Sequence, residues 1–383
     1  MRKAYIFWKD NPSVRLYEHI FFETKTKFQY PPSSLILNYI SDTVGYRLSN
    51  PMLNFASRLA VAAQVCSMGA LAAVLASRWG SPKPTRFMIG SFAALAMFGT
   101  MAFYPVVQGY FLGQIQTWLN AAFILACLAY SLDRRILAGL FVGAICLVKP
   151  HFSLFLLWAA VRRQWQFIAG WCLIAIPISL ASLLIFGFAN HSDYLNVLSH
   201  LSRHGEVFSP NQSLNGLLNR LLATGDSLTF KNDAFPPYNF IVHFGTLASS
   251  LALIGTALLY RRRATNVSLA DFLIMGVTLT IASPIAWEHH YGILPAAYVL
   301  LWVFWIFNPH ARRTLQWILL ASSHAFASVW WLSFDLLAGT WLNILQSYLY
   351  LAALVLLWLL YAERDEIAAV EMSSAEVRPL LPT

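Results

Sequence analysis

Charged residues are scarce in this sequence, and their scarcity sets the class of the protein. Only 11% of the 383 residues are charged, whereas 58% are hydrophobic, and the mean hydropathy is +0.57. A soluble globular domain has about 25% charged residues. The composition therefore excludes a soluble domain and predicts an all-α, polytopic bundle of transmembrane helices. The net charge of +9 does not indicate nucleic acid, because most basic residues stand in short loops beside apolar runs, as topology determinants do.

Cysteines are also few, and their positions exclude two kinds of framework. Cys66, Cys127, Cys146 and Cys172 all lie inside apolar runs, without metal-ligand spacing and without a disulfide pattern. We interpret them as small buried residues. No metal and no cofactor is expected.

Long apolar runs dominate the part of the chain from residue 55 to residue 361. We expect the bundle there, after a polar segment (1–54) and before a cytoplasmic tail (362–383) that forms a short helix and then becomes disordered. The longest polar loop is 190–239. Its stretches 194–201 and 214–222 have amphipathic spacing, which predicts interfacial helices. The apolar runs are 56–76, 87–103, 114–132, 165–188, 240–260, 268–281, 291–307, 315–332 and 341–361.

Two further runs are too short to cross a bilayer, because a straight transmembrane helix needs about 20 residues. Ile136–Val148 ends at Lys149, and Phe152–Val161 returns to Arg162 and Arg163. This pattern predicts a hairpin of two half-helices with Lys149 at its tip. Such discontinuous helices often build binding sites, and a Lys at mid-bilayer depth costs about 2.5–3.5 kcal/mol. The alternative is that Lys149 extends to the membrane interface.

An unusual polar stretch, Ser283–Tyr291, separates two apolar runs. It contains Glu288, His289 and His290, and Pro284 is expected to break the preceding helix because it has no N–H. The freed backbone needs protein or water as partner, which predicts a wet cavity rather than contact with lipid. Ionisable groups at such a depth are functional candidates. The alternative is an interfacial turn whose Trp and Tyr belong to an aromatic belt.

The basic residues predict the orientation of the bundle. The loops rich in Lys and Arg should be cytoplasmic: 78–86, 134–135, 162–163, 261–263 and 312–313, together with the tail. The turn 104–113, the loop 190–239 and the stretch 283–291 then share the outer face. Residues 1–54 would lie outside as well, and nothing in the sequence carries them across. We therefore expect a first transmembrane helix before Met1. The alternative is that this segment stays inside and 56–76 does not span normally.

Four motifs occur in the order found in one family of membrane enzymes. They are Tyr30-Pro31-Pro32; Gly113-Gln114 followed by Arg134-Arg135, Ala138-Gly139 and Lys149-Pro150; Asn211-Gln212-Ser213 with Gly216 and Arg220; and Ser283-Pro284 with Trp287 and His289-His290. Together they resemble glycosyltransferase family 87, the polyprenyl-phosphate-mannose-dependent α-mannosyltransferases with the GT-C fold. Each motif alone is weak, whereas four in order over about two-thirds of the chain are fairly specific.

The resemblance implies transfer of a mannosyl group, with inversion, from a polyprenyl-phosphate sugar to a lipid- or glycan-linked acceptor. It also implies a multi-pass protein of a bacterial plasma membrane with its active site on the outer face. The absence of an Asp-x-Asp pair fits a lipid-linked donor and no metal. Membrane lipid is a further expected partner.

The site residues follow from these tasks. A carboxylate has to take the acceptor proton, and cations or N–H donors have to stabilise the phosphate leaving group. We expect Glu288, His289 and His290 to be catalytic, with Glu288 as base or as support for a histidine. Lys149 and Arg220 are expected to bind the donor phosphate. Tyr30, Gln114, Asn211 and Gln212 are expected to bind substrate. For the two amides of the long loop, ordinary loop capping is the alternative.

One feature departs from the family. Its catalytic Asp stands in the first outer loop, before Tyr-Pro-Pro, and Tyr17 matches a tyrosine downstream of that Asp. The Asp is then expected before Met1, since the surroundings of Asp10 do not match. The chain as given is accordingly expected to be inactive.

A lipid or sugar transporter, or flippase, is the alternative function, because half-helices and a buried Lys also suit transporters. Against this alternative, the sequence has no internal repeat, and the intramembrane acids Asp271 and Asp335 lie near the ends of runs.

Overall fold

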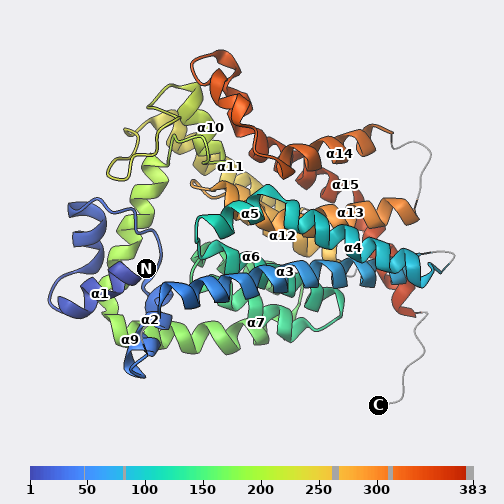
Figure 1. The fold of residues 1–383 in the computed structure, drawn as a ribbon, viewed down its shortest axis with the longest axis horizontal. Coiled ribbons are helices and arrows are strands. Elements are labelled where there is room, and N and C mark those ends of the chain that lie inside the picture. The colour runs from blue at the N-terminus through green and yellow to red at the C-terminus, as the bar shows by residue number, and fades with distance from the viewer. Residues whose placement is uncertain (47, 81–82, 261–266, 309–313, 377–383) are drawn as a thin grey trace.

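The computed structural model describes residues 1–46, 48–80, 83–260, 267–308 and 314–376. In this part of the chain it contains helices and no β-strand, which confirms the predicted all-α bundle (Figure 1). The basic residues 261–263 and 312–313 and the end of the tail lie outside the described residues. The helices, with short 3₁₀ or π turns labelled η, are α1 (Arg2–Asp10), η1 (Glu18–Glu23), η2 (Pro32–Leu35), α2 (Ile36–Thr43), α3 (Asn50–Trp79), α4 (Arg86–Ala102), α5 (Tyr104–Phe111), α6 (Gln116–Ser131), α7 (Arg135–Cys146), η3 (Pro150–Ser153), α8 (Leu154–Val161), α9 (Trp165–His204), α10 (Leu214–Leu221), α11 (Phe240–Leu259), α12 (Leu269–Ile281), η4 (Glu288–Ile293), α13 (Leu294–Phe307), α14 (Thr314–Ser328), η5 (Leu332–Leu337), η6 (Trp341–Ser347) and α15 (Tyr348–Glu376).

Long apolar helices make this an integral, multi-pass membrane protein. Among the described residues, 4 helices are long and apolar enough to cross a membrane: α3, α9, α11 and the stretch Trp341–Ser373. The pair α4 and α5 would be a fifth span, bent by 50° at Phe103. The bend has a local cause, because Pro105 in the first turn of α5 has no N–H to continue the hydrogen bonding of α4.

Several apolar helices are shorter than the roughly 20 residues of a full span. Two of them, α7 and α8, flank the turn that carries Lys149, as the predicted hairpin requires. Helix α7 packs closely on α9: a Cβ on Gly139 would lie 2.1 Å from the carbonyl oxygen of Phe167, and one on Gly170 would lie 2.0 Å from that of Ile136. Small residues allow this approach of two backbones. The hairpin is therefore fixed against a full-length span.

Helix α9 changes direction at Gly187, whose φ of 77° and ψ of 155° are not helical. Its first part runs along the bundle, and its second part turns across the bundle's end (Figure 1). That second part contains the predicted interfacial stretch 194–201. Residues 1–46 pack against it through a separate apolar cluster that includes Tyr17, Leu35, Phe186, Tyr194 and Val197. The polar N-terminal segment thus lies beside the polar loop that follows α9.

The two ends of the bundle differ in chemistry. One end, called the site end, gathers residues 1–46, 104–114, 205–239 and 283–291 around a large cavity. The other, called the basic end, gathers Arg78, Arg135, Arg163 and Glu371 around a smaller cavity. Both feet of the α7–α8 hairpin, Arg135 and Arg163, line the basic end, whereas Lys149 at its tip lines the cavity at the site end.

A buried ion pair holds the basic end together. The side chains of Arg162 and Asp271 are each 1% exposed and form an ion pair. Arg162 also donates to the carbonyl oxygens of Ala257 (2.8 Å) and Leu258 (3.1 Å). Arg364 of α15 lies 3.9 Å from the same Asp271 carboxylate. Four helices meet at this ion pair. The short helix predicted for the tail is the end of α15, which continues to Glu376.

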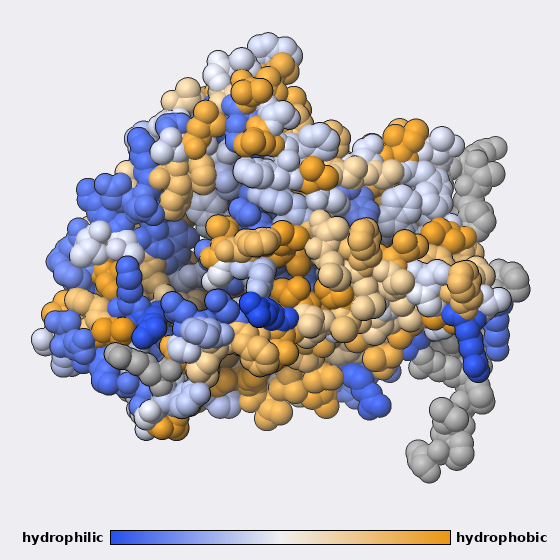
Figure 2. Space-filling model, in the orientation of Figure 1, coloured by the Kyte–Doolittle hydropathy of each residue, from blue (hydrophilic) through white to orange (hydrophobic). Residues whose placement is uncertain are grey.

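The surface agrees with this division. Figure 2 shows hydrophobic residues in a broad area over the helical body and hydrophilic residues gathered at the left, over the N-terminal elements. Exposed apolar side chains on α4, α9 and α11 include Phe98, Leu184 and Leu251. Large exposed apolar areas of this kind face lipid rather than water.

We predict that the two ends lie on opposite sides of the membrane. Single cysteines placed at Arg163 and Arg203, both exposed, should react with an impermeant maleimide from opposite sides, in a background without native cysteines. Labelling of both positions from one side would show that the cavity and the basic loops face the same compartment.

Candidate active site

A cavity of about 920 Å³ opens at the site end. This volume lies within the range of ligand sites, roughly 300–1,000 Å³. Several separated stretches of the chain supply its polar lining, which explains why no single motif reveals the cavity. The polar and ionisable residues that line it include Lys27, Gln29, Tyr30, Tyr104, Gln108, Gln114, Lys149, His151, Glu288, His289, His290 and Asp335.

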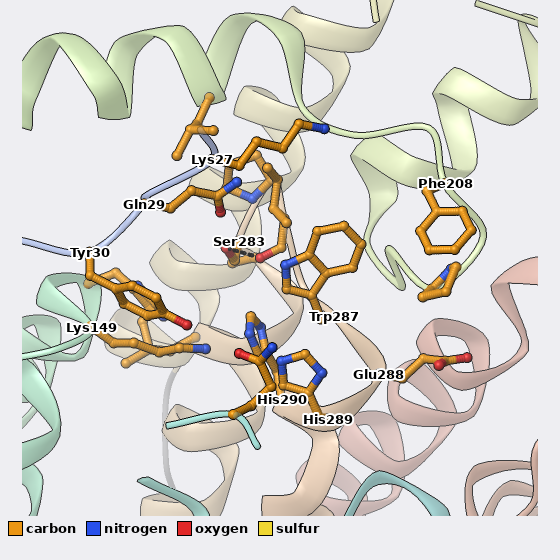
Figure 3. Close-up of a pocket in the computed structure, with 18 of the residues that line it drawn as sticks. Lys27, Gln29, Tyr30, Lys149, Phe208, Ser283, Trp287, Glu288, His289 and His290 are labelled. Atoms are coloured by element: carbon orange, nitrogen blue, oxygen red, sulfur yellow. Dashed lines mark hydrogen bonds between the residues drawn. The ribbon is translucent and has the colours of Figure 1, made fainter. Parts of the chain in front are cut away.

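Lys149 and the histidine pair form one wall of this cavity. Lys149 and Tyr30 lie next to each other and point toward His289 and His290 (Figure 3). The two imidazole rings are 4.9 Å apart and perpendicular. No hydrogen bond or ion pair joins the Lys149 amine to another described residue. Burial lowers the pKa of the Lys149 amine well below its usual range, and an anionic ligand would supply the counter-charge that keeps this amine protonated.

Buried amides fix the turn that carries the histidines. The Asn120 side chain donates to the carbonyl oxygen of His289 (3.0 Å) and accepts from Gln116 (2.7 Å). Gln64 donates to the carbonyl oxygen of Gly292 (2.8 Å). A Cβ at Gly292 would lie 2.1 Å from the Asn120 amide nitrogen, so a side chain there would displace the amide that holds the turn. These amides lie within apolar runs, and their spacing alone did not indicate a role.

The ionisation of His289 follows from its surroundings between the membrane helices. Burial, helped by the charge of Lys149, lowers the pKa of His289 to about 3. The imidazole is therefore neutral near pH 7, with one N–H donor and one acceptor nitrogen.

Glu288 points away from the imidazoles, toward the opposite wall (Figure 3). Its carboxylate oxygens accept from the hydroxyls of Tyr104 (2.8 Å) and Tyr348 (3.1 Å). Burial raises the pKa of Glu288, and the two tyrosine hydroxyls act in the opposite direction. Its hydrogen-bond partners are thus tyrosines rather than a histidine, and the residue lines the cavity.

The Asn-Gln-Ser motif braces the broken stretch after α12. The Asn211 amide donates to the carbonyl oxygen of Pro284 (3.3 Å) and accepts from the backbone N–H of Ala286 (2.9 Å). Ser213 also donates to Pro284 (2.9 Å) and caps α10 through the N–H of Gly216 (3.1 Å). Backbone groups that the ended helix leaves free are thereby satisfied.

Gln212 connects the same loop to the last helix. Its amide donates to the carbonyl oxygen of Gln346 (2.7 Å) and accepts from the backbone N–H groups of Leu349 (3.1 Å) and Tyr350 (3.3 Å). Arg220 is 3% exposed, and its guanidinium donates to the carbonyl oxygen of Asn211 (3.2 Å) and to Ser347 Oγ (2.6 Å).

The expected site residues thus divide into two groups. Glu288, His289, His290, Lys149, Tyr30 and Gln114 line the cavity together. Asn211, Gln212 and Arg220 do not line it and are occupied by protein partners, as the loop-capping alternative describes for the two amides. Ligand contact by any of these residues remains a prediction.

Two cavity residues come from a segment that sequence reasoning passed over. Trp330 and Asp335 follow α14 and line the wall near Glu288. The Trp330 ring lies parallel to that of Tyr104, 6.0 Å away. The sequence indicates Asp335 only as an acid near the end of an apolar run. Its position between two apolar runs, beside aromatic residues, is the same signal that marked Glu288.

Lys27 is a second cation on the wall, and it is neutralised. It forms a 2.6 Å ion pair with Glu206, in which both side chains are less than one-tenth exposed. It also lies over the rings of Phe230 and Phe235. Lys27 therefore joins the N-terminal segment to the long loop, and Lys149 differs from it in having no such partner.

We predict that removing the Gln212 amide weakens the fold. Gln212→Leu removes the side-chain partner of two backbone N–H groups and of two carbonyl oxygens, which should lower the free energy of unfolding by about 1–3 kcal/mol. Thermal unfolding in detergent measures the effect. Gln114→Leu is the matched control, since that side chain lines the cavity. Equal destabilisation by both variants would contradict the bracing role.

Comparison with known proteins gives the family. The family model described as Glycosyltransferase family 87 matches residues 28–284. No curated protein and no solved structure shows a significant match. The matched region contains the hairpin, the braced loop and the start of the stretch after α12. Because it covers more than half of the chain, this protein belongs to glycosyltransferase family 87 and is a membrane glycosyltransferase.

Proposed function

We propose that this glycosyltransferase moves a mannosyl, or another hexosyl, group from a polyprenyl-phosphate sugar to a lipid- or glycan-linked acceptor. The observation that carries the proposal is Lys149, a buried amine without a counter-charge, in one cavity with a histidine pair and a carboxylate. A phosphate diester between lipid and sugar supplies the anion that this wall lacks. A neutral donor would leave the charge of Lys149 uncompensated.

The reaction divides the work between the two walls. The acceptor oxygen attacks the anomeric carbon, and the bond from that carbon to the phosphate oxygen breaks. The leaving polyprenyl phosphate keeps the electron pair, and Lys149 with an imidazole N–H stabilises its growing charge. Glu288 takes the proton of the acceptor hydroxyl, for which a raised pKa is favourable. Attack opposite the leaving group inverts the configuration.

The apolar lining supports a lipid-linked donor. Leu154, Leu198, Leu247 and Ile254 line the same cavity, on α8, α9 and α11. All three helices also carry exposed apolar side chains, which include Leu157, Leu184 and Leu251. An isoprenoid chain is accommodated by such a wall while its phosphate reaches Lys149.

The outer face is the proposed side of the reaction. The cavity lies at the end opposite to the basic loops, and short loops rich in Lys and Arg are retained in the cytoplasm.

The phosphate assignment predicts losses of turnover. Lys149→Ala and His290→Ala should each lower turnover by about 10²–10³, because one preorganised donor is worth that much. Both should also weaken binding of the polyprenyl-phosphate sugar. Lys231→Ala, an exposed lysine of the long loop, is the control. Near-normal turnover by both folded variants would remove Lys149 and His290 from the phosphate site.

The same assay separates the two expectations for the base. Turnover by the chain as given, lost in Glu288→Gln, assigns the base to Glu288. Donor binding without turnover would contradict the assignment of Glu288 as the base.

The donor class gives a second prediction. Transfer should require a polyprenyl-phosphate sugar and should survive EDTA, because the proposed mechanism uses a lysine and imidazoles to stabilise the phosphate. Radiolabelled sugar transfer in membranes measures both. Transfer from a nucleotide sugar alone, or loss of turnover with chelator, would contradict the mechanism.

A further inference from the structure

The wall opposite Lys149 has its own distinct chemistry. It contains the two carboxylates of the cavity lining, Glu288 and Asp335, and the aromatic side chains of Tyr104 and Trp330. The Trp330 and Tyr104 rings are parallel, with an interplanar angle of 3°. Trp330 is 53% exposed although its ring lines the cavity, so part of this ring is open to a ligand.

Buried neighbours hold these groups in place. Asp335 Oδ1 accepts from the amide of Gln346 (3.1 Å), which is itself 2% exposed. The carbonyl oxygen of Gln346 accepts from Gln212, so the bracing loop also supports Asp335. Tyr104 and Tyr348 hold Glu288 from the other side. The carboxylates are therefore fixed in position before a ligand binds, which reduces the entropy lost on binding.

We propose that this wall, formed by Tyr104, Glu288, Trp330 and Asp335, is the acceptor subsite and that it takes an uncharged sugar ring. The proposal rests on the proposed function and adds the chemical class of the acceptor. Carboxylate oxygens accept hydrogen bonds from hydroxyls, and a sugar ring offers several hydroxyls that are close together. The apolar C–H face of the ring packs on the Trp330 indole. Asp335 holds the sugar, and Glu288 lies beside the hydroxyl that attacks.

Charge decides which sugars fit. Two carboxylates on one wall repel a uronate or a phosphosugar, and like charges at an interface suppress wrong partners. The donor phosphate is kept at the Lys149 wall for the same reason. The cavity therefore orders its two substrates by charge, with the anionic donor at one wall and the neutral acceptor at the other.

The test compares neutral and anionic glycosides on the full chain in lipid nanodiscs. Saturation-transfer NMR measures the Kd of octyl mannoside, octyl glucoside, octyl galactoside and octyl glucuronide, so the readout needs no turnover. At least one neutral glycoside should bind, at least about tenfold more tightly than the glucuronide. Methyl glycosides form a second arm. Equal binding of the methyl and octyl glycosides would indicate a glycan-linked acceptor. Tighter binding of the octyl glycosides would indicate a lipid-linked acceptor. Both outcomes support a sugar subsite.

Two variants test the assignment of residues. Asp335→Asn should weaken binding of the neutral glycoside. It should also lower the ratio of the glucuronide Kd to the neutral glycoside Kd by about tenfold. Trp330→Ala should weaken the binding of every glycoside. Trp341→Ala, an 82% exposed tryptophan that follows the same segment, is the matched control.

The outcomes distinguish this inference from the proposed function. Binding of no neutral glycoside, or unchanged selectivity in Asp335→Asn, overturns the acceptor subsite even if the polyprenyl-phosphate sugar binds. Failure of that donor to bind, with glycoside binding intact, overturns the proposed donor and leaves the sugar subsite supported.

Discussion

The backbone of a helix that ends inside a membrane bundle has to find new hydrogen-bond partners, and the site of this protein depends on how that constraint is met. Helix α12 ends at Ile281, and Pro284 cannot continue its hydrogen bonding. Asn211, Gln212 and Ser213 supply the missing partners from a loop about 70 positions earlier in the chain. Without these partners the broken conformation of residues 283–291 would be unfavourable, because unsatisfied backbone groups in an apolar setting cost free energy.

The motif residues therefore divide into those that hydrogen-bond the backbone around the site and those that line the cavity. Asn211 and Gln212 use their amides on backbone groups, and Arg220 donates to the loop that holds them. The stretch that they brace then presents Glu288 to one wall and the histidines to another (Figure 3). A 3₁₀ turn makes this possible, because successive residues of η4 point in different directions. Loss of a bracing residue is expected to act on stability first and on turnover through the geometry of η4.

Buried charges at both ends of the bundle are paired within the protein. The basic end neutralises its buried arginine with Asp271, and Lys27 at the site end has Glu206. Lys149 departs from this pattern, whereas the two carboxylates on the opposite wall interact electrostatically with Arg220. Buried charges are usually paired because desolvation is expensive. Departures from that rule inside a cavity indicate where substrates supply the missing partner.

The sequence by itself determined the membrane bundle, the short hairpin with Lys149 at its tip and the break at Pro284. Hydropathy, run length and proline act locally, so each can be read along the chain. It also identified the cavity residues that stand at ends of apolar runs. Only the tertiary structure decided that Asn211, Gln212 and Arg220 point into protein and that Trp330 and Asp335 join the wall. The reason is physical: a polar side chain in a loop has the same sequence pattern whether its partner is a ligand or a backbone group. That choice depends on which distant segments the packed helices bring within hydrogen-bond distance.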